Sequence, residues 1–112
     1  MSQLHIDIAK ACIKEAPREA CGVICGSKVV PLTNISEEPE TSFVIDARDF
    51  LAHSSDIIYH SHPVGDNGFS EQDITVASCL HLLSYVYVVE HDRLERFSID
   101  TGTKIFEKVL GR

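Results

Sequence analysis

The first sixteen residues have the hydrophobic spacing of an amphipathic helix. Apolar side chains recur along this segment at Leu4, Ile6, Ile8, Ala9, Cys12, Ile13 and Ala16. The helix should end before Pro17, because the residue that precedes a proline disfavours helical backbone angles. A strand over residues 20–25 and a return strand over residues 28–32 are expected to follow, separated by the turn at Gly26 and Ser27.

The middle of the chain alternates between polar connections and short apolar runs. Residues 34–40 form an acidic, proline-containing loop, and residues 41–45 have the composition of another short strand. Asp46 is an N-cap candidate, so a short helix is expected over residues 46–52. The apolar run that follows predicts a strand over residues 56–62.

The last third of the chain combines one helix with a strand pair. The helix that begins near Ser70 is expected to continue to Leu83, and the β-branched and aromatic run over residues 85–90 predicts a buried strand. The alternation over residues 93–99 suits an antiparallel partner, and residues 100–103 form a turn before a short tail. This order of helices and strands predicts an α/β or α+β domain with a mixed sheet.

Composition narrows the class of protein. The chain has 112 residues, of which 44% are hydrophobic, so residues 1–112 are expected to form one domain around one core. It has no apolar run long enough for a membrane span, and its first residues lack the features of a signal peptide, so a cytoplasmic location is expected. The net charge is −7 without a Lys/Arg cluster, which argues against nucleic acid as a partner. The oligomeric state stays open.

The cysteines and most of the histidines have no metal-binding spacing. No C-x-x-C pair occurs, so neither a zinc ribbon nor a redox motif is indicated. The four cysteines are expected to be small buried residues, and a cysteine nucleophile paired with His81 or His91 is not favoured by spacing. The four scattered histidines, which should not be ligands, are His5, His53, His81 and His91.

His60 and His62 are different, because they alternate along a predicted strand. Alternate residues of a strand share one face of the sheet, so both imidazoles should point the same way while Tyr59 and Ser61 point to the opposite face. A bare H-x-H pair is a weak motif, and its neighbours decide what it means.

A turn rich in glycine, asparagine and aspartate follows over residues 64–68, and the next helix is expected to begin at Ser70. This turn can bring Asp73 back toward the two histidines. Two imidazoles and one carboxylate leave a tetrahedral zinc ion with an open position for a water that the metal makes more acidic. Taken alone, however, the segment from Ser70 to Asp73 is more often structural, as a variant of the capping box with Ser70 as the N-cap.

The full spacing, H-x-H followed by seven residues and S-x-x-D, resembles the motif of the JAMM (MPN+ or Mov34) zinc metalloproteases at all four positions. The resemblance implies that His60, His62 and Asp73 bind Zn²⁺. It also implies that the Ser70 hydroxyl donates a hydrogen bond to the oxyanion that develops on the attacked carbonyl.

Residues 17–26 resemble the pattern around the catalytic glutamate in small bacterial and phage members of that family. Glu19 occupies the matching position, which implies that it is the general base acting on the zinc-bound water. Without this resemblance, Glu19 would be interpreted as an ordinary surface acid.

The resemblance further implies a mixed, mostly antiparallel curved sheet flanked by helices, and a zinc-dependent metallopeptidase or isopeptidase that hydrolyses an amide bond. Several segments are most similar to the JAMM domain of phage tail assembly protein K, so a protein or peptide substrate is expected, either a ubiquitin-like protein or a phage tail protein. Two alternatives are a peptidase that processes sulfur-carrier proteins and a non-catalytic MPN-type scaffold. Scaffold versions usually lack one or more ligands, and the intact set here favours the enzyme.

Overall fold

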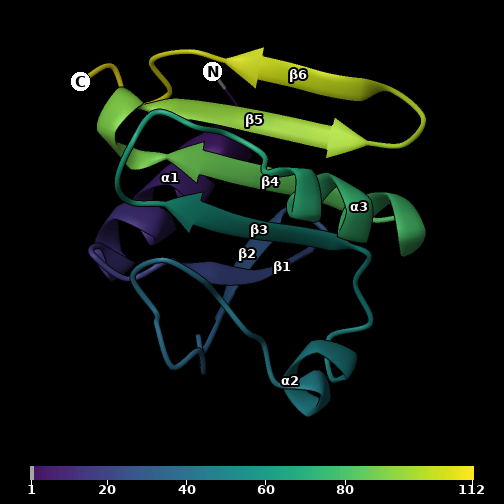
Figure 1. Ribbon diagram of the computed structural model, residues 1–112. Coiled ribbons are helices and arrows are strands. Elements are labelled where there is room, and N and C mark those ends of the chain that lie inside the picture. The colour runs from purple at the N-terminus through teal and green to yellow at the C-terminus, as the bar shows by residue number, and fades with distance from the viewer. Residues whose placement is uncertain (1) are drawn as a thin grey trace.

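The computed structural model describes residues 2–112, which fold around one six-stranded sheet (Figure 1). The strands lie in the order β2-β1-β3-β4-β5-β6, with β3 and β4 parallel and every other neighbouring pair antiparallel. Their bounds are β1 Cys21–Cys25, β2 Lys28–Leu32, β3 Ile57–His62, β4 Leu83–Val88, β5 Arg93–Ser98 and β6 Gly102–Phe106. The predicted α+β class with a mixed, mostly antiparallel sheet is confirmed.

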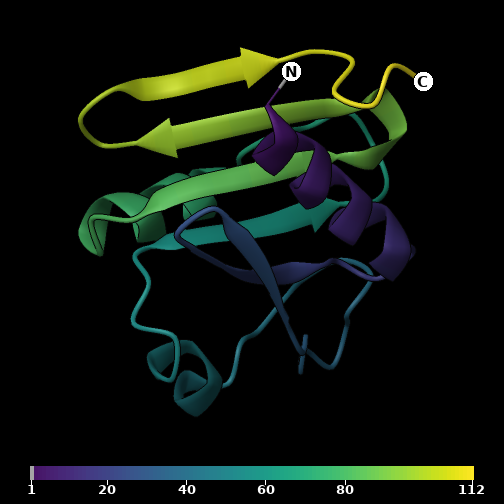
Figure 2. The same cartoon turned by 180° about the vertical axis from the view of Figure 1, so that it is seen from behind.

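The two longer helices cover opposite faces of the sheet, as Figures 1 and 2 show from the two sides. Helix α1 (Gln3–Glu15) crosses one face, and α3 (Glu71–Cys79) lies against the other. Because β3 and β4 are parallel, the chain needs a crossover between them, and α3 supplies it. The short helix α2 (Ala47–Leu51) lies in the long connection between β2 and β3, and a single 3₁₀ turn (Val89–His91) joins β4 to β5.

The core lies between α1 and the sheet. The inner side of α1 buries Ile8, Ala9 and Cys12 completely, and these residues pack with Tyr59 and Tyr87 from the strands. Removing this apolar surface from water is the main force that fixes α1 on the sheet. The helix ends at Glu15, two residues before Pro17, as predicted.

The predicted strand over residues 41–45 is wrong, because a side chain takes the place of a strand partner there. The buried Asn34 donates from Nδ2 to the Ser42 carbonyl, and its Oδ1 accepts from the Val44 N–H. Backbone groups that would otherwise need a neighbouring strand are therefore satisfied locally. This segment is a loop whose Phe43 ring stacks on the His60 ring of β3.

Three predictions for the C-terminal third also differ from the structure. The strand predicted over residues 85–90 is β4 at Leu83–Val88, because the chain turns at Val89–His91. Helix α3 stops at Cys79 instead of Leu83, since His81 takes a left-handed conformation with φ of 52° and the Leu82 N–H bonds back to the Ala77 carbonyl. The predicted tail forms a sixth strand, which pairs with β5 from Ser98–Gly102 to Leu94–Phe106. Short apolar stretches near chain ends give too weak a pattern to separate a strand from a tail.

The prediction for the cysteines holds for only part of the set. Cys12 and Cys21 are buried, whereas Cys25 is half-buried and Cys79 is exposed at the end of α3.

Among residues 2–112, no helix is long and apolar enough to cross a membrane.

Candidate metal centre

Strand β3 carries His60 and His62 on the face that α3 covers. Their ring centroids lie 5.0 Å apart, which confirms that both imidazoles point to the same side. Tyr59 is buried in the core under α1, and the Ser61 Oγ accepts a hydrogen bond of 2.7 Å from the Ala20 N–H. The alternation along one buried strand therefore separates a polar site from the apolar core.

Asp73 completes a cluster of three possible ligands. Its Oδ2 lies 3.2 Å from the His60 Nε2 and 3.7 Å from the His62 Nε2, and the three ligand atoms all lie within 4.8 Å of one another. In a tetrahedral site with bonds of about 2.0–2.1 Å, ligand atoms are about 3.3–3.4 Å apart. The three side chains can therefore bind one metal ion after small movements. Within residues 2–112, this is the only group of histidine, cysteine and acidic side chains that meets the distances for a metal site.

The first turn of α3 holds Asp73 in this position. The Ser70 Oγ accepts from the Asp73 N–H at 3.0 Å, and the Asp73 Oδ2 accepts from the Ser70 N–H at 3.0 Å. This reciprocal pair is a capping box, so the structural interpretation of the S-x-x-D segment is right. It does not compete with a functional role, because the capping bond uses a lone pair of Ser70 and leaves its O–H free to donate.

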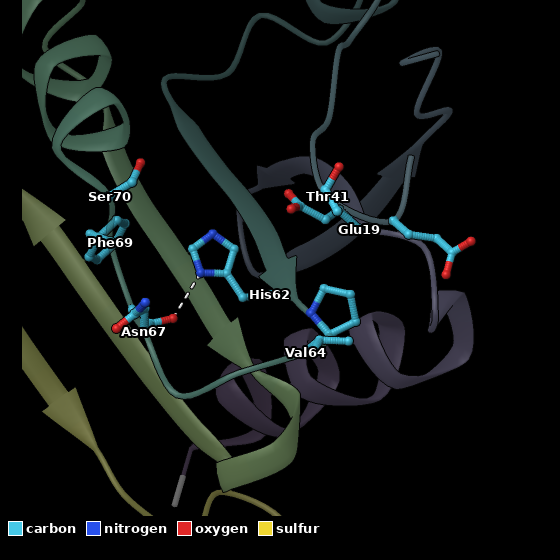
Figure 3. Close-up of a pocket in the computed structure, with 10 residues that line it drawn as sticks. Glu19, Thr41, His62, Val64, Asn67, Phe69 and Ser70 are labelled. Carbon is cyan, nitrogen blue, oxygen red and sulfur yellow. Dashed lines mark hydrogen bonds between the residues drawn. The ribbon is translucent and has the colours of Figure 1, made fainter. Parts of the chain in front are cut away.

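The hydrogen bonds of His62 determine its tautomer. Its Nδ1 lies 2.9 Å from the Asn67 carbonyl oxygen (Figure 3). A carbonyl has no proton to give, so Nδ1 carries a hydrogen, and in the neutral ring the lone pair is then on Nε2, the nitrogen 3.7 Å from the Asp73 Oδ2. This is the arrangement that orients a metal-binding imidazole.

His60 is held by packing. The Phe43 ring stacks on it at 4.7 Å with 25° between the planes, and the imidazole is fully buried. Burial lowers the pKa of His60 more than its contact with Asp73 raises it, so the ring is neutral. Its buried Nδ1 has no hydrogen-bond partner among residues 2–112.

The Asp73 carboxyl is ionised. Burial alone would raise its pKa, but the hydrogen bond with His60, together with the hydrogen bonds from Ser70, holds the pKa well below the usual range. An ionised carboxylate and a neutral His60 imidazole are the protonation states that a divalent metal requires of such ligands.

Glu19 reaches this cluster through the register of β1 and β3. These strands are antiparallel with Cys21 opposite His60, so the residue two positions before Cys21 lies beside His62. Its backbone is fixed on both sides, because its N–H donates to the Pro39 carbonyl at 2.6 Å and its carbonyl accepts from the Asn34 Nδ2 at 2.9 Å. Only 7% of Glu19 is exposed.

Burial raises the pKa of Glu19 to about 7, with the charge of His62 opposing the shift and that of Asp73 adding to it. A carboxyl with this pKa exchanges protons readily near neutral pH, as a general base must.

A stability measurement on the metal-free protein tests this environment. The unfolded chain ionises Glu19 near its ordinary pKa of 4.5 and the folded chain near 7, so the folded state is progressively penalised as the pH rises between these values. The Glu19→Gln substitution should therefore raise the free energy of unfolding by about 1–3 kcal/mol at about pH 8 and change it little at about pH 4. Urea unfolding at both pH values, with EDTA present, measures the difference. An equal effect at both would contradict the assigned environment.

Two open clefts meet at these side chains. One, of about 550 Å³, is lined by residues of the loop after β3, and the other, of about 540 Å³, lies between the segment around Val44 and helix α3. Glu19, His62 and Ser70 line both. Figure 3 shows His62 between Glu19 on one side and Ser70 on the other. All five residues singled out in the sequence are therefore brought together.

Sequence reasoning missed two residues that build the site. Asn34 links Glu19 to the loop that follows it, and Phe43 stacks on His60. Asparagine in a polar segment after a strand often bonds to nearby backbone, which is the one signal that pointed to Asn34. Nothing in the local pattern around Phe43 indicates its contact with β3.

Comparison with known proteins agrees with this architecture. Residues 1–100 match the family model of prokaryotic homologs of the JAB domain. The chain belongs to this family. The solution structure of protein DSY2949 from Desulfitobacterium hafniense is similar, with a TM-score of 0.65 and 20% identity over 96% of this chain and 88% of that one, and this likeness shows the fold alone. No curated protein matches. Membership of the prokaryotic JAB family is consistent with a hydrolase or with a scaffold.

Proposed function

We propose that this JAB-domain protein is a zinc-dependent hydrolase that cleaves peptide or isopeptide bonds in a protein or peptide substrate. One observation carries the proposal: a three-ligand cluster, a buried carboxyl of raised pKa and a free hydroxyl all line the cleft between the segment around Val44 and helix α3. A scaffold has no need for this combination. Two nitrogen ligands and one oxygen ligand in a roughly tetrahedral arrangement favour zinc over the harder cations magnesium and calcium.

His60, His62 and Asp73 would hold the zinc ion. When bound there, zinc polarises the substrate carbonyl and makes water acidic enough to attack near neutral pH. The Glu19 carboxylate accepts a proton from the attacking water and returns it to the leaving amine nitrogen. The Ser70 O–H donates to the carbonyl oxygen as negative charge develops on it.

The shape of the site favours a chain-like substrate. The two clefts share His62 and Ser70 in their walls, and both open to the surface. An extended segment of polypeptide can cross the reacting groups with residues on both sides of the bond that is cut. Ubiquitin-like proteins and phage tail proteins, which the sequence resemblance brings forward, are therefore the first substrates to test.

Metal content tests the proposal directly. We expect elemental mass spectrometry to find one zinc ion per chain in the purified wild-type protein and none in a His60→Ala, His62→Ala double variant. The matched control is a His53→Ala, His91→Ala double variant, which removes two histidines outside the cluster and should keep its zinc. A wild-type protein that takes up no metal when zinc is supplied would overturn the proposal, and the scaffold role would replace it.

A further inference from the structure

The loop between β3 and α3, residues 63–69, is held by two charged side chains of β5. Arg93 donates from Nε to the Glu95 Oε2 at 2.9 Å, and its Nη2 donates to the Asp66 carbonyl. The two side chains are only 16% and 11% exposed. An ion pair that is this far removed from water is costly to form unless its remaining hydrogen-bonding capacity is used, and the Asp66 carbonyl uses part of it.

Glu95 makes the second contact with this loop. A Cβ atom added to Gly68 would collide with both oxygens of the Glu95 carboxylate. Gly68 does not adopt a positive φ, so space and not backbone conformation explains the glycine. The loop backbone therefore rests directly on the carboxylate.

The residue between these two contacts is Asn67, whose carbonyl accepts the hydrogen bond from the His62 Nδ1. The Asn67 carbonyl that orients His62 therefore lies between two fixed neighbours. Arg93 binds the Asp66 carbonyl before it, and Gly68 after it lies against the Glu95 carboxylate. In Figure 1 the loop rises from the end of β3 across β4 toward β5 before it enters α3.

The sheet register explains why β5 can hold a loop that belongs to β3. His62 lies opposite Val88, which lies opposite Arg93, and His60 lies opposite Val86, which lies opposite Glu95. Residues opposite one another in a sheet point to the same face, so the ion pair lies in the same two rows as the histidines, two strands and about 10 Å away. The loop spans the buried valines between them.

The geometry points to Arg93 and Glu95 as positioning residues for the metal centre. They hold residues 66–68 so that the Asn67 carbonyl keeps the hydrogen on the His62 Nδ1 and leaves Nε2 free as a ligand. The expected effect on zinc affinity rests on the proposed metal site, but the tautomer of His62 can be measured without any metal.

The test compares the wild-type protein with an Arg93→Met, Glu95→Met double variant, which removes both charges together and leaves no unpaired buried ion. We expect the dissociation constant for zinc, measured by chelator competition, to rise 10- to 100-fold, the range seen when a partner of a metal-binding histidine is lost. We expect ¹⁵N NMR of the metal-free protein to show one His62 tautomer in the wild type and a mixture in the variant. Phe69 still packs against Phe97 on β5, so the loop is loosened and not released.

Two further variants separate positioning from general stability. Arg93→Lys keeps the positive charge but lacks the planar guanidinium, so its zinc affinity should lie between those of the wild type and the double variant. If the double variant does not fold, Arg93→Lys replaces it in both measurements. Arg96→Met is the matched control, because Arg96 lies on the same strand but over the Phe106 ring on the other face. It should bind zinc as the wild type does.

Wild-type zinc affinity with a single His62 tautomer in both Arg93 variants would overturn the positioning role. If the wild-type protein binds no zinc, the proposed metal site fails, and the NMR comparison alone decides the positioning role. A mixed tautomer confined to the Arg93 variants supports it in either case.

Discussion

Glu19→Gln is expected to lower kcat for amide hydrolysis by about 10²- to 10⁴-fold while the protein keeps its zinc. The amide has nearly the same size as the carboxyl and fits a side-chain position that is only 7% exposed, but it cannot accept a proton from water. Glu19 supplies no atom to the ligand cluster of His60, His62 and Asp73, so metal content should not change. Cleavage of a peptide library, followed by mass spectrometry, measures the rate on many candidate substrates at once.

The pH profile of the wild-type enzyme provides a second measurement for the same residue. A general base must be ionised, so kcat/KM should rise with pH through the pKa of Glu19. That pKa is about 7 in the metal-free site, and a bound cation lowers it, so the acid limb should lie below pH 7. Glu40→Gln is the matched control, because Glu40 lines one of the clefts but is exposed. Equal rates for wild type and Glu19→Gln would exclude Glu19 as the base.

The parts of this site that could be predicted from sequence are those in which a local period determines geometry. The strand period places His60 and His62 on one face, and the capping pattern places Asp73 three residues after Ser70. Alternation also predicted β5 (Arg93–Ser98), whereas β4 (Leu83–Val88) begins and ends two residues before the strand that its composition predicted over residues 85–90. Local pattern failed for the loop around Val44, because the Asn34 side chain, which lies outside that segment, bonds to its backbone groups.

Glu19 is the clearest example of a site residue that local sequence pattern cannot identify. It lies more than forty residues before His62 in the sequence, and only the antiparallel pairing of β1 with β3 brings the two side chains together. Its own surroundings in the sequence are those of a surface acid, and the family resemblance alone singled it out. The Arg93–Glu95 pair was missed for the same reason, since its role depends on the rows of residues that run across β3, β4 and β5.

Asp73 allows ligand binding and helix capping to be measured separately. Asp73→Asn removes the negative charge but keeps an oxygen that can accept from the Ser70 N–H, whereas Asp73→Ala removes both. We expect both variants to lose zinc affinity by more than about 100-fold, because the loss of a ligand should exceed the loss of a partner of a ligand. Chelator competition measures the zinc affinity, and urea unfolding in EDTA measures how much the capping box contributes to the free energy of unfolding.

The two variants should differ in stability and agree in metal binding. Loss of the capping box in Asp73→Ala should lower the free energy of unfolding of the metal-free protein by about 0.5–2 kcal/mol, and Asp73→Asn should lower it by less. Glu71→Gln, an exposed acid in the same helical turn that contributes no ligand, is the control and should keep its zinc. If Asp73→Asn bound zinc as tightly as the wild type, the carboxylate would be a cap alone, and the ligand set would reduce to His60 and His62, too few for a tetrahedral site with one open position.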